Sequence, residues 1–455
     1  MAIDELGALL GSRLNTTAAV RQHHGQDESS FPAVPPDAVA LPHTTEEVAE
    51  IARICSRHRI PIIPYGTGTS VEGHIHALHG GICVDLGEMQ EILRVSAEDM
   101  DCTVQAGVTR NQLNTYLRDT GLFFPVDPGA DASLGGMAST RASGTNAVRY
   151  GTMRENVLAL TVVLADGRII HTGTRARKSS AGYDLTHLIV GSEGTLGIVT
   201  EVTLRLHPVQ EAILAAVCSF PTVHDAVTTV IETIQAGVPI ARMELLDALQ
   251  IRAVNLYSKT DYPEEPHLFL EFHGTHQGVK EQVVTVQQFA HGNNGNDFQW
   301  SVQAEERNRL WHARHNAYLA ALQLKPGSRA VASDVCVPIS RLADCIDATQ
   351  RDIEASYLPI PIVGHVGDGN FHLIILIDPE SEQDRTEAAR INHRLVKRAL
   401  SMGGTCTGEH GIGRGKREYL LEEHGPGVAV MRDLKHALDP HNLMNPGKIF
   451  LGDST

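Results

Sequence analysis

The sequence lacks any long apolar run and any basic cluster, and both absences narrow the function classes. No stretch approaches the ~20 consecutive apolar residues of a membrane-spanning helix, and the opening MAIDELGALLGSRLNT has no cationic segment followed by an apolar one. The formal charge is -16 at pH 7, and no run of Lys and Arg offsets it, which argues against a nucleic-acid partner. We therefore expect a cytoplasmic protein with no transmembrane segment, and peripheral contact with an inner membrane remains an alternative.

Cysteine is also sparse. The seven cysteines are odd in number and scattered, and none forms C-x-x-C, so we expect reduced thiols rather than a disulfide framework. No internal repeat or low-complexity linker is present. The 455 residues, 42% of them apolar, are more than one ordinary core needs, which predicts two or three globular domains.

The first half of the chain alternates helix and strand signals from about residue 38. Thr44 with Glu47 and Thr109 with Gln112 have the spacing of capping boxes, and each box precedes a helical pattern. IPIIPY reads as a short strand that leads into a glycine-rich loop, and GICVDL alternates as a strand should. This order predicts a mixed α and β domain in the first half.

Three separate loops in this half are rich in Gly, Ala, Ser and Thr: GTGTS at 66–70, GGMASTRASGTN at 135–146 and GSEGTLGIVTE at 191–201. None has the lysine or spacing of a nucleotide P-loop, and GTGTS alone is a weak signal. Together they suggest backbone N–H groups that could hold the pyrophosphate of a dinucleotide, because neutral donors can cradle an anion without lysine. The alternative is a turn-rich β region without a ligand.

The pattern of strand and helix signals changes after Pro208. Strand, helix, strand, strand, helix and strand patterns follow one another from AAVCSF to DFQWSV, which is the βαββαβ order of a ferredoxin-like unit. Residues 305–325 and ISRLADCIDATQRDIEAS then read as helices. A last helical stretch leads into the Asn-Pro-Gly turn of NPGKIF. The pattern predicts a separate α+β domain and a C-terminal helical segment.

A candidate metal site lies in this second half. GHVGDGNFH places His365 and His372 on either side of a Gly-Asp-Gly-Asn turn, and TGEHGIG supplies Glu409 about forty residues later. If PIVGH and FHLIILI pair as antiparallel strands, the two histidines oppose each other with Cβ atoms ~5 Å apart. Two imidazoles and a carboxylate suit a divalent ion with open positions, and zinc, manganese and iron all tolerate such ligands. A metal-dependent hydrolase would use the same three residues.

Six motifs in the same order give the chain a specific resemblance from about residue 38 to 450. PYGTGTSVEG, DPGADASLGGMASTRASGTNAVRYGTMRENV, GSEGTLGIVTEVTLRL, GHVGDGNFH, GTCTGEHGIGRGKREYL and NPGKIF resemble the flavin-linked D-2-hydroxy acid dehydrogenases. The likeness is greatest to their D-lactate dehydrogenase (cytochrome) branch. These enzymes belong to the vanillyl-alcohol-oxidase and p-cresol-methylhydroxylase flavoprotein superfamily.

The resemblance implies a fold class and domain boundaries. It implies an α+β protein: a two-subdomain FAD-binding module of the p-cresol-methylhydroxylase (PCMH) type at 1–210, a ferredoxin-like α+β cap domain with the metal site at 211–430, and a C-terminal helical segment at 431–455 that returns to the FAD domain.

The resemblance also implies which residues hold FAD. Relatives with covalently bound flavin place a histidine in the first loop, whereas this chain reads GTGTSVEG and its next histidine is His74, so we expect non-covalent FAD. The expected contacts are Tyr65, Gly66, Thr67, Gly68, Thr69, Ser70, Pro128, Gly129, Ser133, Gly136, Ser139, Thr140, Ser143, Gly144, Thr145, Glu193, Ile198, Val199 and Asn445.

By the same resemblance, His365, His372 and Glu409 are the metal ligands, His410 is the base, and Arg314 clamps the substrate carboxylate. A guanidinium can bind a carboxylate through two parallel hydrogen bonds. An ordinary surface ion pair for Arg314, and a supporting role beside Glu409 for His410, are the alternatives. Glutarate-oxidising relatives carry a lysine near the position of Ala332 and Ser333, so its absence here favours a short monocarboxylic acid.

The expected function is oxidation of a D-2-hydroxy acid, D-lactate to pyruvate. His410 would take the hydroxyl proton with help from a bound Zn or Mn ion, and the C2 hydrogen would leave as hydride to FAD N5. The expected acceptor is cytochrome c, a quinone or an electron-transfer protein, and a homodimer is one expected assembly. D-2-hydroxyglutarate and glycolate dehydrogenases are the alternatives, followed by the hydrolase and an inactive interaction subunit.

Overall fold

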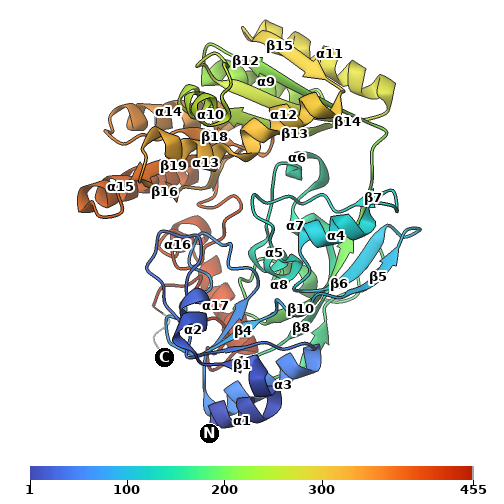
Figure 1. Ribbon diagram of the computed structural model, residues 1–455, viewed down its shortest axis with the longest axis vertical. Coiled ribbons are helices and arrows are strands. Elements are labelled where there is room, and N and C mark those ends of the chain that lie inside the picture. The colour runs from blue at the N-terminus through green and yellow to red at the C-terminus, as the bar shows by residue number, and fades with distance from the viewer. Residues whose placement is uncertain (453–455) are drawn as a thin grey trace. The chain divides into compact units, whose positions relative to one another are not determined.

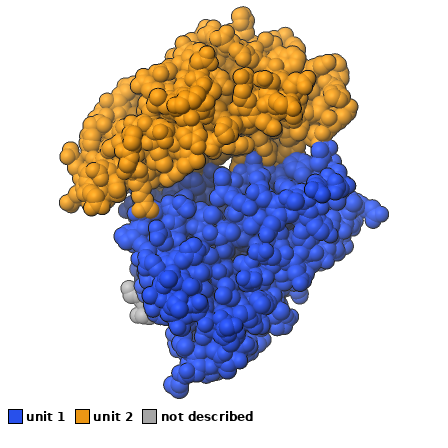
Figure 2. All heavy atoms as spheres, in the orientation of Figure 1, with its two compact units in different colours: residues 1–143, 151–209, 409–455 blue, residues 144–150, 210–408 orange. Residues whose placement is uncertain are grey.

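The computed structural model describes residues 1–452, which divide into two compact units (Figure 1 and Figure 2). Unit 1 comprises residues 1–143, residues 151–209 and the chain from 409 onward, and unit 2 comprises residues 144–150 and 210–408. No helix within residues 1–452 is both long and apolar enough to cross a membrane. None of the seven cysteines, all of which lie in this range, forms a disulfide, as the sequence predicts.

The first subdomain of unit 1 is built on a four-stranded sheet in the order β1-β2-β4-β3, in which β2, β4 and β3 run parallel. Helix α3 begins after Thr44, whose hydroxyl accepts from the Glu47 amide as predicted; the Glu47 carboxylate binds Arg13 and the His43 amide instead of closing the box. The elements are α1 (Ala2–Leu10), β1 (Leu14–Asn15), α2 (Ala18–His23), β2 (Ala38–Ala40), α3 (Thr45–His58), β3 (Ile62–Tyr65) and β4 (Ile82–Asp85).

The second subdomain of unit 1 is an antiparallel five-stranded sheet in the order β5-β6-β10-β8-β9 with its own apolar core. The Thr109–Gln112 capping box forms at the start of α4 as predicted. The elements are β5 (Ile92–Ser96), β6 (Asp101–Gln105), α4 (Arg110–Leu117), β7 (Leu122–Phe123), α5 (Leu134–Thr140), α7 (Met153–Asn156), β8 (Val157–Val163), β9 (Ile169–His171), α8 (Leu185–Ile189), β10 (Ile198–Arg205) and β11 (His207–Pro208). The two cores confirm the expected two-subdomain organisation.

The C-terminal segment adds α16 (Leu420–His424) and α17 (Gly427–Leu438) to unit 1. Beyond α17 the chain runs beside β3, where Ile62 donates to the Leu443 carbonyl and Asn445 donates to the Ile62 carbonyl. Buried Lys435 donates to Asp439 at the end of α17 and so fixes this turn. The NPGKIF motif therefore lies next to the strand that leads into the first glycine-rich loop.

Unit 2 contains the predicted ferredoxin-like unit. Its strands are ordered β15-β12-β14-β13, which is the 4-1-3-2 order expected for βαββαβ, with α9 and α11 as the two crossover helices. The elements are β12 (Ala212–Ser219), α9 (Val223–Gln235), β13 (Ile240–Leu246), β14 (His267–Gly274), α11 (His276–Gly292) and β15 (Asn296–Ser301). An additional helix, α10 (Ala248–Ser258), lies between β13 and β14.

The remainder of unit 2 extends the same sheet beyond β13, in the order β13-β18-β19-β16, with β17 also paired to β19. The predicted helix at 305–325 is present but breaks at Asn316. The elements are α6 (Ala147–Tyr150), α12 (Ala304–His315), α13 (Ala317–Ala321), β16 (Arg329–Ala332), β17 (Val335–Cys336), α14 (Leu342–Glu354), β18 (Ile362–Gly364), β19 (Asn370–Ile377) and α15 (Glu382–Ser401). Strands β13, β18 and β19 are therefore neighbours; His372 lies on β19, and His365 directly follows β18.

Candidate active site

The first glycine-rich loop follows β3 and packs closely against the residue that precedes α5. A Cβ on Gly66 would lie 2.3 Å from Ser133 Oγ, so no larger residue fits at this position without displacement. Ser133 occupies the N-cap position of α5 but makes no capping hydrogen bond, and its buried hydroxyl has no hydrogen-bond partner among residues 1–452. Leaving a buried hydroxyl unpaired is costly, so these residues fit a ligand with oxygen atoms, such as a dinucleotide, at this loop.

Glu193 and Asn445, both expected to contact FAD, lie together in unit 1. Asn445 Nδ2 donates to the Glu193 carbonyl at 2.8 Å and to the His74 carbonyl at 3.0 Å. Both residues have left-handed backbone, with φ of 54° and 43°, which is uncommon for residues other than glycine. The buried Glu193 carboxylate accepts from the amides of Ile412 and Gly413 at 2.7 and 2.8 Å. Its side chain thus holds the segment that follows Glu409.

The ionisation of Glu193 follows from its neighbours. Burial alone would raise the pKa of this carboxyl, but His74, whose Nε2 lies 3.3 Å away, and the two amides hold the pKa below its ordinary value. The carboxylate is therefore charged at neutral pH inside unit 1.

The other expected flavin residues are distributed over both units. In unit 1, the hydroxyls of Ser139 and Thr140 on α5 donate to the backbone carbonyls of the residues four positions earlier, at 2.8 and 3.1 Å. Gly144 and Thr145 belong to unit 2. Unit 1 holds Tyr65, Gly66, Thr67, Gly68, Thr69, Ser70, Pro128, Gly129, Ser133, Gly136 and Ser143 on or beside the first two glycine-rich loops, and Ile198 and Val199 on β10.

The two histidines of GHVGDGNFH lie in unit 2 at the end of the β18–β19 hairpin. Their ring centroids are 5.5 Å apart and their planes cross at 82°. They are close, but they are not the predicted cross-strand pair: Val363 is the partner of His372, and His365 falls just beyond β18. The reason is the turn, in which a 3-10 segment at Val366–Asp368 and Gly369 at φ 81° make the connection longer than a tight hairpin.

Each histidine has its Nδ1 engaged by an acceptor in unit 2. His365 Nδ1 lies 2.7 Å from Oε1 of the fully buried Glu244 on β13, and His372 Nδ1 lies 3.0 Å from the Ser333 carbonyl. Neither acceptor carries a proton when Glu244 is ionised, so both imidazoles donate from Nδ1. An ion bound to either ring would therefore contact Nε2, which is the usual arrangement of a histidine ligand supported by a second acceptor.

Arg314, the expected substrate clamp, binds the same carboxylate. Its Nε and Nη2 lie 2.8 and 2.6 Å from Glu244 Oε2. Burial alone would raise the pKa of Glu244, but His365 and Arg314 hold it below its ordinary value. Two of the five guanidinium N–H donors are used here, so the others can bind a substrate carboxylate.

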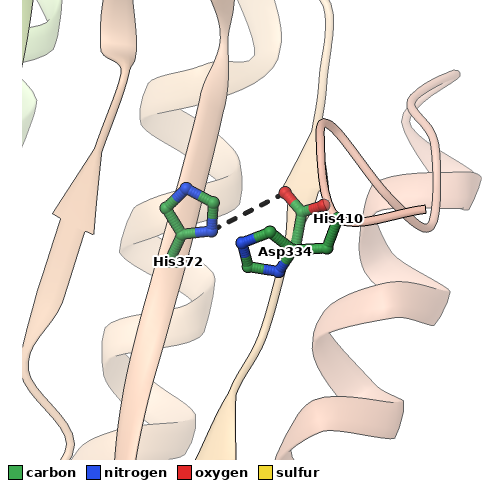
Figure 3. A group of neighbouring side chains, drawn as sticks. All are labelled: Asp334, His372 and His410. Carbon is green, nitrogen blue, oxygen red and sulfur yellow. Dashed lines mark ion pairs between the residues drawn. The ribbon is translucent and has the colours of Figure 1, made fainter. Parts of the chain in front are cut away.

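A second buried carboxylate, Asp334, lies beside His372, and Figure 3 shows both with His410. Asp334 Oδ1 is 3.6 Å from His372 Nδ1 and accepts from Asn370 Nδ2 at 2.7 Å, and its Oδ2 accepts from Thr407 Oγ1 at 2.7 Å. Thr407 is two residues before Glu409. Asp334 therefore binds both β19, which carries His372, and the segment that leads to Glu409 and His410.

Two groups of side chains have ligand atoms within 4.8 Å of one another: His365, His372 and Glu409, and Asp334, His372 and His410. The first is the predicted ligand set. Two imidazole nitrogens and one carboxylate oxygen at this spacing fit a divalent ion with open coordination positions. His410, the predicted base, is the next residue after Glu409.

Sequence reasoning missed Glu244 and Asp334. Each is an acidic residue next to apolar ones: Glu244 lies between Met243 and Leu245, and Asp334 directly precedes Val335. Such a residue is seldom buried unless it is paired, which is a usable signal for a site. The sequence did not reveal their partners, which lie between 36 and 121 positions away.

The chain matches known families over most of its length. Residues 209–449 match the family described as FAD linked oxidases, C-terminal domain, and residues 36–173 match an FAD binding domain. A relative from Danio rerio named "Probable D-lactate dehydrogenase, mitochondrial" is 56% identical over 436 residues, which are 95% of this chain and 88% of the relative. The D-lactate dehydrogenase (cytochrome), mitochondrial, of Arabidopsis thaliana is 47% identical over 450 residues, 98% of this chain and 79% of the relative.

Solved structures show the same fold at low sequence identity. A p-cresol methylhydroxylase crystallised with substrate bound has a TM-score of 0.82 at 17% identity, covering 100% of this chain and 97% of that one. A 4-ethylphenol oxidase from Gulosibacter chungangensis has a TM-score of 0.80 at 18% identity, covering 99% and 96%. The expected α+β fold of the PCMH type is therefore confirmed.

The expectation of a cytoplasmic protein is contradicted by these comparisons, because the Danio, Arabidopsis and yeast relatives are all named mitochondrial. The expectation rested on the absence of a targeting pattern at the start of this sequence, and that absence does not carry the conclusion. The two matched domains and the relatives' identities show that the chain belongs to the FAD-linked oxidase family that includes the D-lactate dehydrogenases.

Proposed function

We propose that the protein is an FAD-dependent dehydrogenase that oxidises D-lactate to pyruvate and passes the electrons to a cytochrome-type acceptor. The observation that carries this proposal is the cluster of His365, His372 and Glu409, in a chain 56% and 47% identical to relatives named D-lactate dehydrogenase. The acceptor follows from the word cytochrome in the Arabidopsis and yeast names.

The FAD-binding role falls to unit 1. The loop at Gly66–Ser70, the unpartnered Ser133 hydroxyl and the backbone of the third loop at Glu193 would hold the cofactor without covalent attachment. Bound FAD supplies the electron acceptor for the C2 hydrogen, which leaves with both bonding electrons. The match of residues 36–173 to an FAD binding domain favours this reaction over the metal-dependent hydrolase.

The metal-binding role falls to His365, His372 and Glu409. A zinc or manganese ion held there would act as a Lewis acid toward the substrate hydroxyl. Arg314 would orient the substrate through its carboxylate, and His410 would accept the hydroxyl proton, since an imidazole titrates near neutral pH. These roles require that both substrate oxygens and the base reach the same small region, and the 4.8 Å spacing of the candidate ligand atoms supports that.

Ala332 and Ser333 support a short substrate. Ser333 Oγ accepts from the Leu373 amide at 2.8 Å and its carbonyl binds His372, so this residue is committed to positioning β19. Neither residue can supply the second cation that a distal carboxylate would need. A Bacillus subtilis relative, 35% identical over 425 residues, is named glycolate oxidase subunit GlcD, so glycolate is the alternative substrate to include.

The test is a substrate panel with purified, FAD-loaded protein and cytochrome c as acceptor. We expect the highest kcat/KM with D-lactate, a lower value with glycolate and D-2-hydroxyglutarate, and no turnover with L-lactate. A preference for D-2-hydroxyglutarate would contradict the argument from Ala332. Absence of bound flavin in the purified protein would contradict the proposal as a whole.

A further inference from the structure

Glu244 is a buried carboxylate whose two oxygens serve two different residues of the proposed site. Oε1 lies 2.7 Å from His365 Nδ1, and Oε2 lies 2.8 and 2.6 Å from Nε and Nη2 of Arg314. We propose that Glu244 is the positioning residue that sets both the ion-binding nitrogen of His365 and the substrate-facing edge of Arg314. This inference rests on the proposed metal site.

Glu244 constrains the imidazole of His365. A carboxylate can only accept, so its contact with His365 fixes the proton on Nδ1 and the ligand lone pair on Nε2. The contact also fixes the rotation of the ring. His372 obtains the same two constraints from the Ser333 carbonyl at 3.0 Å, so both rings are oriented before an ion arrives. Supporting acceptors of this kind typically change metal affinity by about 10–100-fold when they are lost.

Glu244 also constrains the guanidinium of Arg314. Glu244 binds the edge of Arg314 formed by Nε and Nη2, which directs the opposite edge, with its further N–H donors, away from the carboxylate. The Arg314 side chain is 11% exposed, so its charge is largely removed from water and requires a nearby anion. Glu244 provides that anion. One carboxylate therefore links the ligand to the proposed clamp, and its loss should affect ion binding and substrate binding together.

The same unit contains a matched group with no role in the site. On β13 and β14, Arg242 Nε lies 3.5 Å from Glu271 Oε1, and His273 Nε2 lies 2.8 Å from the same oxygen. His273 Nδ1 is bound by the Tyr150 hydroxyl at 2.7 Å, so both of its ring nitrogens are used within the protein. This second Arg–Glu–His group has the same chemistry and similar burial, but it offers no nitrogen to an ion.

The experiment compares E244Q with E271Q in full-length, FAD-loaded protein that has been stripped of metal. Glutamine keeps the size of the side chain. Because His365 and Arg314 contact different oxygens of Glu244, the single oxygen of glutamine can replace only one of the two contacts. At the other contact its NH2 group faces an N–H donor. We expect E244Q to bind Mn²⁺ or Zn²⁺ about 10–100-fold more weakly in chelator competition, with a raised KM for D-lactate and unchanged FAD content. E271Q should keep the wild-type ion affinity and KM.

Each outcome decides a separate question. If E244Q binds the ion as tightly as wild type, the inference is wrong while the proposed function stands. If wild-type protein binds neither ion, the proposed metal site is wrong, and the inference about Glu244 is wrong as well. If E244Q does not fold, E244D carries the test, because it keeps both acceptor oxygens on a shorter side chain. We then expect about 10-fold weaker ion binding, and wild-type affinity in E244D would overturn the inference.

Discussion

Glu193 holds the backbone immediately after the predicted ligand and base, and its replacement by glutamine tests that role. The carboxylate accepts from the amides of Ile412 and Gly413 at 2.7 and 2.8 Å, three and four residues after Glu409. Hydrogen bonds to a charged group contribute about 1.5–3 kcal/mol each. Glutamine keeps one acceptor oxygen and presents an amide donor to the other N–H, so E193Q should favour opening of this segment by about 2–3 kcal/mol.

Amide hydrogen exchange measures that opening directly. Since 1.4 kcal/mol corresponds to about tenfold in an equilibrium constant, the amides of residues 412 and 413 should exchange about 30- to 150-fold faster in E193Q. E201Q is the control: Glu201 lies on β10 in the same unit and accepts from Thr161 Oγ1 at 2.7 Å, but it does not contact this segment. Exchange of residues 409–415 should not change in E201Q.

The pH dependence gives a second check. The pKa of Glu193 in the folded protein lies below its ordinary value, so its stabilising contribution is fully present above the ordinary glutamate pKa and is lost as the pH falls through the lowered pKa. The difference in exchange rate of amides 412 and 413 between wild type and E193Q should therefore be largest at neutral pH and should decrease at acidic pH. If the two proteins exchange at rates within about threefold of each other at pH 7, the Glu193 carboxylate does not hold this segment.

Three further predictions use other parts of the structure. Burial raises the pKa of Asp247 to about 7 from 3.8, so wild type loses stability as the pH rises through that interval. D247N keeps the cap acceptor for the Gln250 amide but carries no charge. It should be more stable than wild type by at most about 4 kcal/mol at pH 8 and equally stable near pH 4. Equal melting temperatures at pH 8 would contradict this. G66A places a Cβ 2.3 Å from Ser133 Oγ and should weaken FAD binding about tenfold or more in a fluorescence titration; unchanged affinity would separate this loop from the cofactor. H410A should lower kcat by about 100-fold with FAD and metal content intact, and a loss under about tenfold would demote His410 to a supporting role.

Sequence patterns predicted the elements whose signals are local. The βαββαβ order of unit 2 follows from hydrophobic period and loop signals, and the sheet order β15-β12-β14-β13 confirms it. The Thr109–Gln112 capping box also forms because its partners are three residues apart. The grouping of His365, His372 and Glu409 came from motif spacing and the resemblance together, and the structure places their ligand atoms within 4.8 Å.

Contacts between residues far apart in the sequence could not be predicted from local patterns. Residues 247–267 carry no clear helix or strand pattern, but α10 forms there because tertiary packing buries it. Gln250 Nε2 on its first turn donates to the Ala317 carbonyl, 67 positions away. The contact of Glu244 with His365 likewise depends on β13 and β18 being neighbours, which joins strands 121 positions apart.

The histidine register shows a different limit. GHVGDGNFH allows a tight turn with His365 opposite His372, or a longer one, and residue preferences do not choose between them. The 3-10 segment at Val366–Asp368 shifts the pairing so that Val363 faces His372. Ring proximity survives this shift because both side chains still lie at the turn end of the hairpin.

The proposed function requires that the histidine cluster act together with bound flavin in the oxidation of D-lactate. Anaerobic stopped-flow mixing of D-lactate with FAD-loaded wild type and H372N tests it most directly, because flavin absorbance reports reduction without an external acceptor. We predict rapid loss of the oxidised-flavin band in wild type and at least about 100-fold slower loss in H372N, with equal flavin content before mixing. Equal rates in the two proteins, or no reduction of wild type by D-lactate, would contradict the claim.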